Sequence, residues 1–162
     1  MHDCNLPHLQ HEHALYARAQ AIQGKHLPVC LGLLDLVLPY YHEGVAFRTF
    51  LLLSWAGRPI LACLQQIDKG LIVMQARTAL TELHRLRIMH RDVEVRNILY
   101  DASRGTVMIV DLERAEWLGR AVVDVSDGNE GRRGKEGSGR KKDPFVRELR
   151  AMVAHVEQCI NP

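Results

Sequence analysis

The chain has 162 residues, 47% hydrophobic and 25% charged, with a net charge of +2 at pH 7. This length suits one domain with its own core, and the near-neutral charge gives no strong footprint for binding nucleic acid. Asp35, Arg48 and Arg58 interrupt the apolar runs, so no stretch is expected to span a membrane. Four scattered cysteines without a C-x-x-C pair favour free thiols over disulfides, and hence an intracellular setting, cytoplasmic or nuclear.

The first eleven residues are polar and rich in histidine, which predicts a frayed terminus over residues 1–11. A zinc site is the alternative there, since cysteine and histidine are zinc ligands, but their spacing matches no standard metal module. The histidine-rich cluster consists of Cys4, His8, His11 and His13. The frayed terminus is the preferred interpretation.

A helix is predicted over residues 12–23. Leu15, Ala19 and Ile22 fall on one helical face, and Gly24 stands where a glycine commonly ends a helix. Because only one face is apolar, this helix is expected to pack against the rest of the domain along a single stripe.

Two strands and two further helices are predicted next. The strands cover residues 29–38 and 46–54, and their nearly continuous apolar character is typical of buried strands. A short helix is predicted over 58–68, with Pro59 in its first turn. A longer helix over 70–87 has apolar residues at spacings of three and four, so it is expected to be a core element.

A hairpin is predicted directly after Asn97. Residues 98–100 and 106–110 are apolar and strand-like, and residues 101–105 have turn chemistry. Because a hairpin brings its two ends together, Asn97 and Asp111 are expected to lie side by side.

The residues around this hairpin carry a family resemblance. His90 to Asn97 reads H-R-D-x-x-x-x-N and resembles the catalytic loop of protein kinases. Asp111-Leu112-Glu113 resembles the kinase D-F-G segment, in a variant similar to that of a fungal kinase-like group. The resemblance covers roughly residues 10–118. It implies an α+β protein-kinase-like fold with a truncated small lobe and a shortened, mainly helical large lobe.

The resemblance also implies phosphoryl transfer from Mg-ATP to a protein hydroxyl. Asp92 would be the catalytic base, and Arg96 would support catalysis four residues later. Asn97 and Asp111 would bind the metal and the cofactor, because Mg²⁺ prefers oxygen ligands. Glu12 matches the helix acid that pairs with a strand lysine beside ATP, although a helix-start acid favoured by the dipole explains it equally well.

Several features depart from the kinase pattern. No glycine-rich loop and no strand lysine precede Glu12, so the phosphate clamp is missing from the sequence. Glu94 stands where lysine is usual and would repel phosphates, and Glu113 stands where glycine is usual. Weak or absent turnover is therefore expected.

Three alternatives stay open. The chain could be a non-catalytic pseudokinase that holds a protein partner through an exposed apolar surface. It could be a small-molecule phosphotransferase resembling the aminoglycoside kinases, whose loop and Asp-aromatic-Glu ending are similar. It could also be a fragment of a longer kinase-like protein. Binding to nucleic acid or to a membrane is not expected in any of these cases.

Three regions are predicted along the chain. Residues 1–123 would form the partial kinase-like domain, and 124–143 a flexible linker rich in glycine and charge. An amphipathic helix is predicted over 144–160, with Asp143 as its cap and Pro144 in its first turn.

Overall fold

The structure is a computed structural model and describes residues 6–65, 67–119 and 143–160. The predicted linker over 124–143 lies outside the described residues, except for Asp143. In chain order the elements are α1 (Leu6–Arg18), the 3₁₀ helix η1 (Gln20–Ile22), β1 (Cys30–His42), β2 (Val45–Leu53), β3 (Arg58–Pro59), the 3₁₀ helix η2 (Ile60–Ala62), α2 (Lys69–Arg85), β4 (Ile88–Met89), the 3₁₀ helix η3 (Val95–Asn97), β5 (Ile98–Asp101), β6 (Thr106–Ile109), β7 (Glu116–Trp117) and α3 (Pro144–Ile160).

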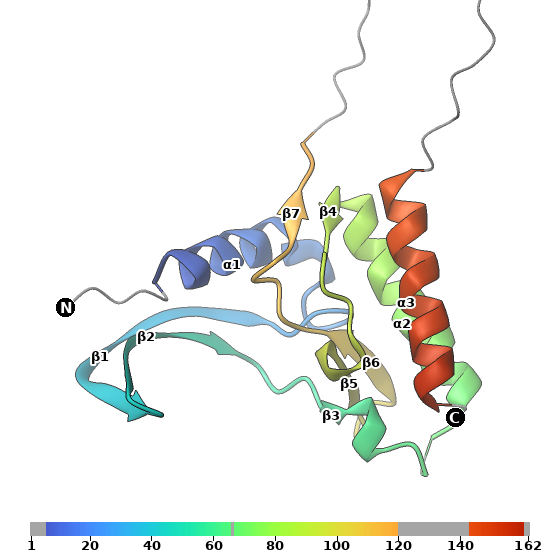
Figure 1. Ribbon diagram of the computed structural model, residues 1–162, viewed down its shortest axis with the longest axis horizontal. Coiled ribbons are helices and arrows are strands. Elements are labelled where there is room, and N and C mark those ends of the chain that lie inside the picture. The colour runs from blue at the N-terminus through green and yellow to red at the C-terminus, as the bar shows by residue number, and fades with distance from the viewer. Residues whose placement is uncertain (1–5, 66, 120–142, 161–162) are drawn as a thin grey trace, which may run out of the picture.

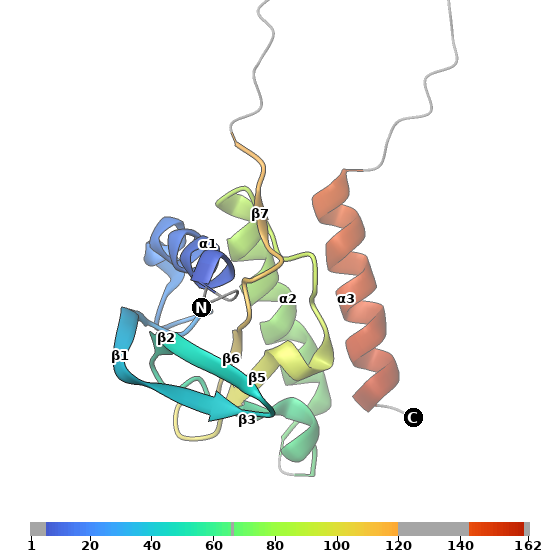
Figure 2. The ribbon, with the colours of Figure 1, turned by 60° about the vertical axis from the view of Figure 1, so that its left-hand side comes forward.

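The main core lies between α2, α3 and the β5–β6 hairpin. The helices α2 and α3 run side by side in opposite directions, and β5 and β6 lie against α2 (Figures 1 and 2). Leu80 and Leu83 of α2, Ile109 of β6 and Val156 of α3 are all fully buried there. This core is the platform on which the loop from His90 onward is built.

The helix α2 confirms the helix predicted over 70–87, with slightly different ends. It begins at Lys69 because the Asp68 carboxylate accepts a hydrogen bond from the Leu71 amide at 3.0 Å. The predicted apolar stripe is buried along its inner face, at Ile72, Ala76, Ala79 and Leu83. Its last turn delivers the chain directly to β4 and His90.

The helix α3 also begins as predicted, at Pro144. The Asp143 carboxylate accepts a hydrogen bond from the Phe145 amide at 3.0 Å, which caps the helix. The side chains of Met152, Val156 and Ile160 are buried on the face that meets α2. The segment is therefore a packed part of the domain rather than an independent helix.

The hairpin predicted after Asn97 is confirmed. In it, β5 and β6 are antiparallel, with Ile98 opposite Ile109 and Asp101 opposite Thr106. The Asp101 carboxylate accepts hydrogen bonds from the Ser103 amide and hydroxyl, which closes the turn. The neighbouring strand β3 completes a three-stranded sheet in the order β3-β5-β6.

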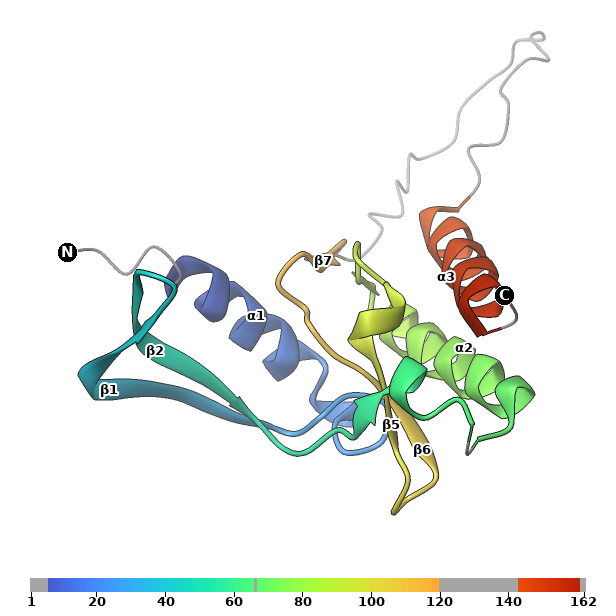
Figure 3. The ribbon, with the colours of Figure 1, turned by 60° about the horizontal axis from the view of Figure 1, so that its bottom comes forward.

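A second hairpin, β1–β2, projects away from the helical core, with α1 lying alongside it (Figure 3). Its turn is tighter than predicted, because β1 continues to His42 and only Glu43 and Gly44 connect the strands. Both turn residues have positive φ, 48° and 80°, as a two-residue hairpin turn requires. Between the pairs Asp35–Thr49 and Tyr40–Phe47 the register shifts, so β1 bulges there.

The prediction that these two strands are buried was wrong. Val37 is 98% exposed and Leu38 is 79% exposed, and both lie in the bulge. The cause is the small size of the sheet: within the described residues it has two strands, and one face meets α1. An apolar run marks a buried strand only if other elements cover both faces.

The first helix was predicted too late in the sequence. It begins at Leu6 rather than residue 12, because Pro7 fits a first helical turn, where no amide hydrogen bond is lost. It ends at Arg18 instead of residue 23, and the 3₁₀ helix η1 follows. Gly24 therefore does not end this helix as predicted; it turns the chain after η1, with φ 74°.

The short helix predicted over 58–68 was also wrong. Arg58 and Pro59 instead form β3 and pair with Tyr100 and Leu99 of β5. Pro59 has extended geometry, with φ −50° and ψ 133°, which fits a strand edge. Just before it, Gly57 has φ 106°, and a Cβ atom at this position would collide with the backbone of Tyr100.

Candidate active site

His90 is the buried hub of the candidate site. Its Nε2 atom donates to the Val110 carbonyl oxygen at 2.9 Å, and its Nδ1 atom accepts from the Asp92 amide at 3.3 Å. Burial lowers the pKa of His90, so the ring is neutral, and one donor with one acceptor is what a neutral imidazole offers. The ring thereby ties the loop to the end of β6.

Asn97 and Asp111 occupy neighbouring backbone positions at the open end of the β5–β6 hairpin. The Val110 amide donates to the Asn97 carbonyl oxygen at 2.9 Å, one step beyond the last strand pair. The Asn97 side-chain nitrogen donates to the Asp92 carbonyl oxygen at 3.0 Å. This contact uses the amide nitrogen and leaves the amide oxygen as the free end of the side chain.

Asp92 and Arg96 form an ion pair within the loop. The Arg96 Nη2 atom lies 2.8 Å from the Asp92 Oδ2 atom, and the side chains are 64% and 14% exposed. Arg96 also approaches Glu94 at 4.0 Å, and His155 of α3 lies 3.1 Å from the same carboxylate. The acidic residue in the usual lysine position is therefore flanked by two basic side chains.

Glu12 reaches the site from α1. Its Oε1 atom accepts a hydrogen bond from the Leu112 amide at 3.0 Å, directly after Asp111. Burial raises the pKa of Glu12, and the charges of Asp111 and Glu113 raise it further. The structure thus brings Glu12 to the segment that directly follows Asp111.

Asn97 and Asp111 carry oxygen atoms of the type that could bind a magnesium ion. The free amide oxygen of Asn97 and the carboxylate of Asp111 are hard donors of the kind that Mg²⁺ prefers. Among the described residues no cluster of three or more His, Cys, Asp or Glu side chains is placed to hold a metal. Cys4, one member of the alternative zinc cluster, lies outside the described residues.

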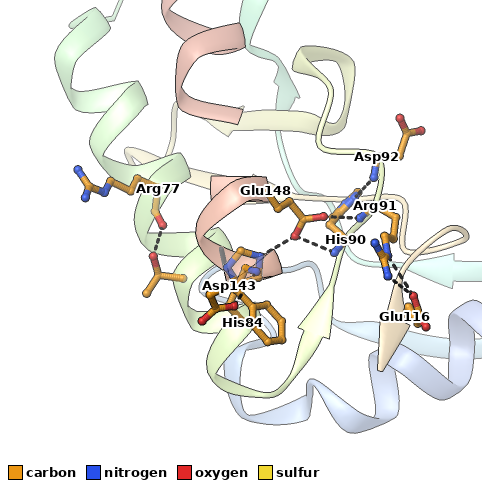
Figure 4. A network of polar contacts seen from close by, with 10 residues as sticks. Arg77, His84, His90, Arg91, Asp92, Glu116, Asp143 and Glu148 are labelled. Atoms are coloured by element: carbon orange, nitrogen blue, oxygen red, sulfur yellow. Dashed lines mark hydrogen bonds and ion pairs between the residues drawn. The ribbon is translucent and has the colours of Figure 1, made fainter. Parts of the chain in front are cut away.

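Glu148 of α3 holds the backbone of the loop at His90 and Arg91. The sequence did not predict this role. Its carboxylate accepts hydrogen bonds from the amides of His90 at 3.2 Å and Arg91 at 2.6 Å, and from His84 at 2.6 Å (Figure 4). Burial alone would raise the pKa of Glu148, but the hydrogen bonds from His84, Arg91 and His90 outweigh it and hold the pKa below its usual value. No local pattern could reveal this contact, because it joins residues 58 positions apart.

Glu116 was missed for the same reason. The contact of Glu116 with Arg91 results from the pairing of β4 with β7. This pairing places Glu116 opposite Met89 and brings the Glu116 carboxylate to the Arg91 side chain. The Arg91 Nε atom donates to Glu116 Oε2 at 3.0 Å (Figure 4). Arg91 itself has φ 68°, a backbone conformation disfavoured for a residue with a side chain. Glu116 and Glu148 together hold the loop at this strained residue.

Among the comparisons with known proteins, a solved structure supports the fold. No family model matches the chain. The meiotic driver SPOK2 of Podospora anserina is 34% identical over 111 residues, which are 68% of this chain and 14% of that protein. The solved structure of the Cydia pomonella granulovirus kinase PK-1 superposes with a TM-score of 0.50 at 16% identity, over 68% of this chain and 39% of that one. The chain has a protein-kinase-like fold.

The fold comparison confirms the predicted α+β kinase-like architecture with a truncated small lobe. The chain spans well under half the length of either similar protein, so the activity of a complete kinase cannot be transferred to it directly. In the described part of the chain, no helix is long and apolar enough to cross a membrane.

Proposed function

We propose that this chain is a kinase-like domain that binds Mg-ATP at the His90–Asn97 loop and has weak or no phosphoryl transfer on its own. The observation that carries the proposal is that hydrogen bonds link the buried His90 ring to the loop at Asp92 and to Val110 after β6, and link Val110 to Asn97. The ring holds the Asp92 amide and the Val110 carbonyl, and Val110 in turn holds Asn97. The carboxylates of Asp92 and Asp111 and the amide of Asn97 are thereby supported by one buried hub.

Each group has a role in this proposal. Asn97 and Asp111 would hold Mg²⁺, which neutralises phosphate charge when it is bound. Asp92 would accept the proton of a protein hydroxyl as the hydroxyl oxygen bonds to the terminal phosphorus of ATP and ADP leaves. Arg96 orients the Asp92 carboxylate through their ion pair.

The proposed weakness of turnover follows from Glu12. A carboxylate whose pKa is raised by burial and by two acidic neighbours gains from a cation, such as the strand lysine that pairs with the corresponding acid in kinases. Without a phosphate-holding lysine and a glycine loop from elsewhere, the domain would lack roughly 3 kcal/mol or more of transition-state stabilisation, by analogy with single electrostatic donors. Binding of the nucleotide is therefore a better test than turnover.

A non-catalytic interaction module is the second candidate, and one observation favours it. The β1–β2 hairpin exposes a large share of its apolar side chains, as a surface that holds a protein partner would. We further propose a relationship to the fungal kinase-like group, since the similar meiotic driver comes from a fungus. On this proposal the chain corresponds to one part of a larger protein.

Calorimetric titration with ATP, with and without Mg²⁺, tests the first candidate. We expect saturable, magnesium-dependent binding by the parent chain and at least about a tenfold loss of affinity in Asp111→Asn, which removes a charged ligand without changing shape. Glu157→Gln, on the exposed side of α3, serves as the control and should bind as the parent does. A parent chain that melts cooperatively but binds no nucleotide would overturn the proposal and favour the interaction module.

A further inference from the structure

The segment after Asp111 is held against α1 by two consecutive side chains of that helix. Glu12 accepts a hydrogen bond from the Leu112 amide at 3.0 Å, and the His11 Nε2 atom lies 2.9 Å from the Ala115 carbonyl oxygen. Between these two points the Ala115 amide donates to the Leu112 carbonyl at 3.0 Å and closes a turn. Glu12 therefore holds the first residue of the turn from Leu112 to Ala115, and His11 holds the last.

Asp111 needs such support because of its backbone. Its φ is 69°, in the left-handed region that residues with a side chain rarely adopt. A conformation of this kind persists only where the surroundings fix it from several sides. His90 holds the Val110 carbonyl on one side of Asp111, and α1 holds the turn on the other.

The contact of His11 depends on a hydrogen bond rather than on charge. A backbone carbonyl only accepts, so the Nε2 atom of His11 carries the hydrogen and donates it. This holds for the neutral ring with its proton on Nε2 and for the doubly protonated ring alike. Ala115 is 2% exposed, so its carbonyl would have little access to water if His11 did not reach it.

We infer that His11 is a positioning residue for Asp111: by holding the Ala115 carbonyl it keeps the turn, and with it the proposed metal-binding carboxylate, in place. The inference rests on the proposed function. A neighbouring histidine of α1 provides the contrast, because His8 lies 3.4 Å from Glu113 with both side chains about half exposed. An exposed pair of this kind contributes little.

A matched pair of variants isolates the hydrogen bond. His11→Gln keeps an N–H donor on a flexible side chain, whereas His11→Met has a similar length without a donor, and both residues favour helices. His8→Met is the control on the same helix. Two measurements are made on each full chain: the Mg²⁺-dependent affinity for ATP, and amide hydrogen exchange over residues 110–117, which needs no nucleotide.

We expect His11→Met to weaken Mg-ATP binding about threefold to tenfold, the range for one lost hydrogen bond, and to speed exchange over 110–117 by a similar factor. His11→Gln should recover most of both effects, and His8→Met should change neither by more than about twofold. Equal behaviour of the Gln and Met variants, or no change in either, would overturn the inference.

The two measurements also separate this inference from the proposed function. If the parent binds no Mg-ATP, the proposed function fails and the metal-positioning role of His11 fails with it. The exchange result still decides whether His11 holds the turn. If the parent binds Mg-ATP and His11→Met binds equally well, only the role of His11 is overturned.

Discussion

The loop from His90 to Asn97 and the β1–β2 hairpin differ in the burial and hydrogen bonding of their side chains. Around the loop, the ring of His90 and the amide of Asn97 are buried, and each has a hydrogen-bond partner from a distant part of the chain or from the loop itself. The hairpin instead presents apolar side chains to solvent, including Val37 at 98% exposure. One polar contact joins its two strands, in which the Thr49 hydroxyl donates to the Asp35 carboxylate.

If the proposed function holds, this difference affects the two requirements of phosphoryl transfer unequally. Placing a base and two metal ligands demands rigid geometry, and the loop has it because Glu148, Glu116 and His90 fix its backbone. Binding a nucleotide requires polar or basic groups that contact its phosphates. The β1–β2 hairpin instead exposes apolar side chains. Under the proposed function, the groups for chemistry would therefore be better fixed than the groups that bind the nucleotide.

The largest expected effect concerns Gly57, where the hairpin meets the loop-bearing sheet. Gly57→Ala should lower the free energy of unfolding by about 3 kcal/mol or more, because the added Cβ collides with the backbone of Tyr100 and the φ of 106° disfavours any side chain. Urea unfolding followed by circular dichroism measures the loss.

Gly105→Ala is the matched control for this prediction. Gly105 also has positive φ, 64°, but an added Cβ would meet no atom closer than 4.0 Å. We expect it to cost about 1 kcal/mol, from the backbone conformation alone. If both alanines cost the same, the close approach of Gly57 to β5 does not contribute to stability.

A smaller effect is expected where α3 holds the loop. Glu148→Gln should lower the free energy of unfolding by about 2 kcal/mol, because the Gln amide cannot replace a carboxylate that accepts from two backbone amides and from His84. Glu157→Gln on the exposed face of the same helix is the control, and it should change stability by less than about 0.5 kcal/mol.

The same carboxylate predicts an acid sensitivity with a defined sign. The pKa of Glu148 in the folded chain lies below its usual value of 4.5, so the folded state favours the charged form. Its contribution to stability is therefore complete above pH 4.5 and is lost as the pH falls through the lowered pKa. Glu148→Gln should remove this part of the pH dependence, and an unchanged acid profile in the variant would contradict the assignment.

The sequence predicted the elements whose signals are local. The cap at Asp143, the stripe along α2 and the turn from Asp101 to Ser103 depend on residues within a few positions of one another, and the structure confirms them. The placement of Asn97 beside Asp111 also followed from the hairpin between them, without any knowledge of distant contacts.

The parts that the sequence did not predict depend on distant partners. His11 meets Ala115 across 104 positions and Glu148 meets His90 across 58, and no periodicity records such a contact. The exposure of Val37 was missed for a related reason. An apolar run predicts a strand, but its burial depends on which elements cover the sheet.

The smallest expected effect tests the hairpin itself. Val37→Thr keeps the shape of the side chain and the preference for a strand, and Val37 is already 98% exposed, so the free energy of unfolding should change by less than about 0.5 kcal/mol. Val107→Thr in β6 is the matched comparison, because Val107 is 2% exposed and a buried hydroxyl without a partner costs about 1 to 3 kcal/mol. Urea unfolding of both variants measures the difference.

A large loss in Val37→Thr would mean that the hairpin is covered in solution, either by residues outside the described part of the chain or by another molecule. The two cases differ in their dependence on protein concentration, since cover by a second copy stabilises the fold by mass action and cover within one chain does not. A loss that shrinks on dilution would thus favour association through the hairpin, because dilution removes the second copy from the parent as well, and this is the behaviour expected of an interaction module.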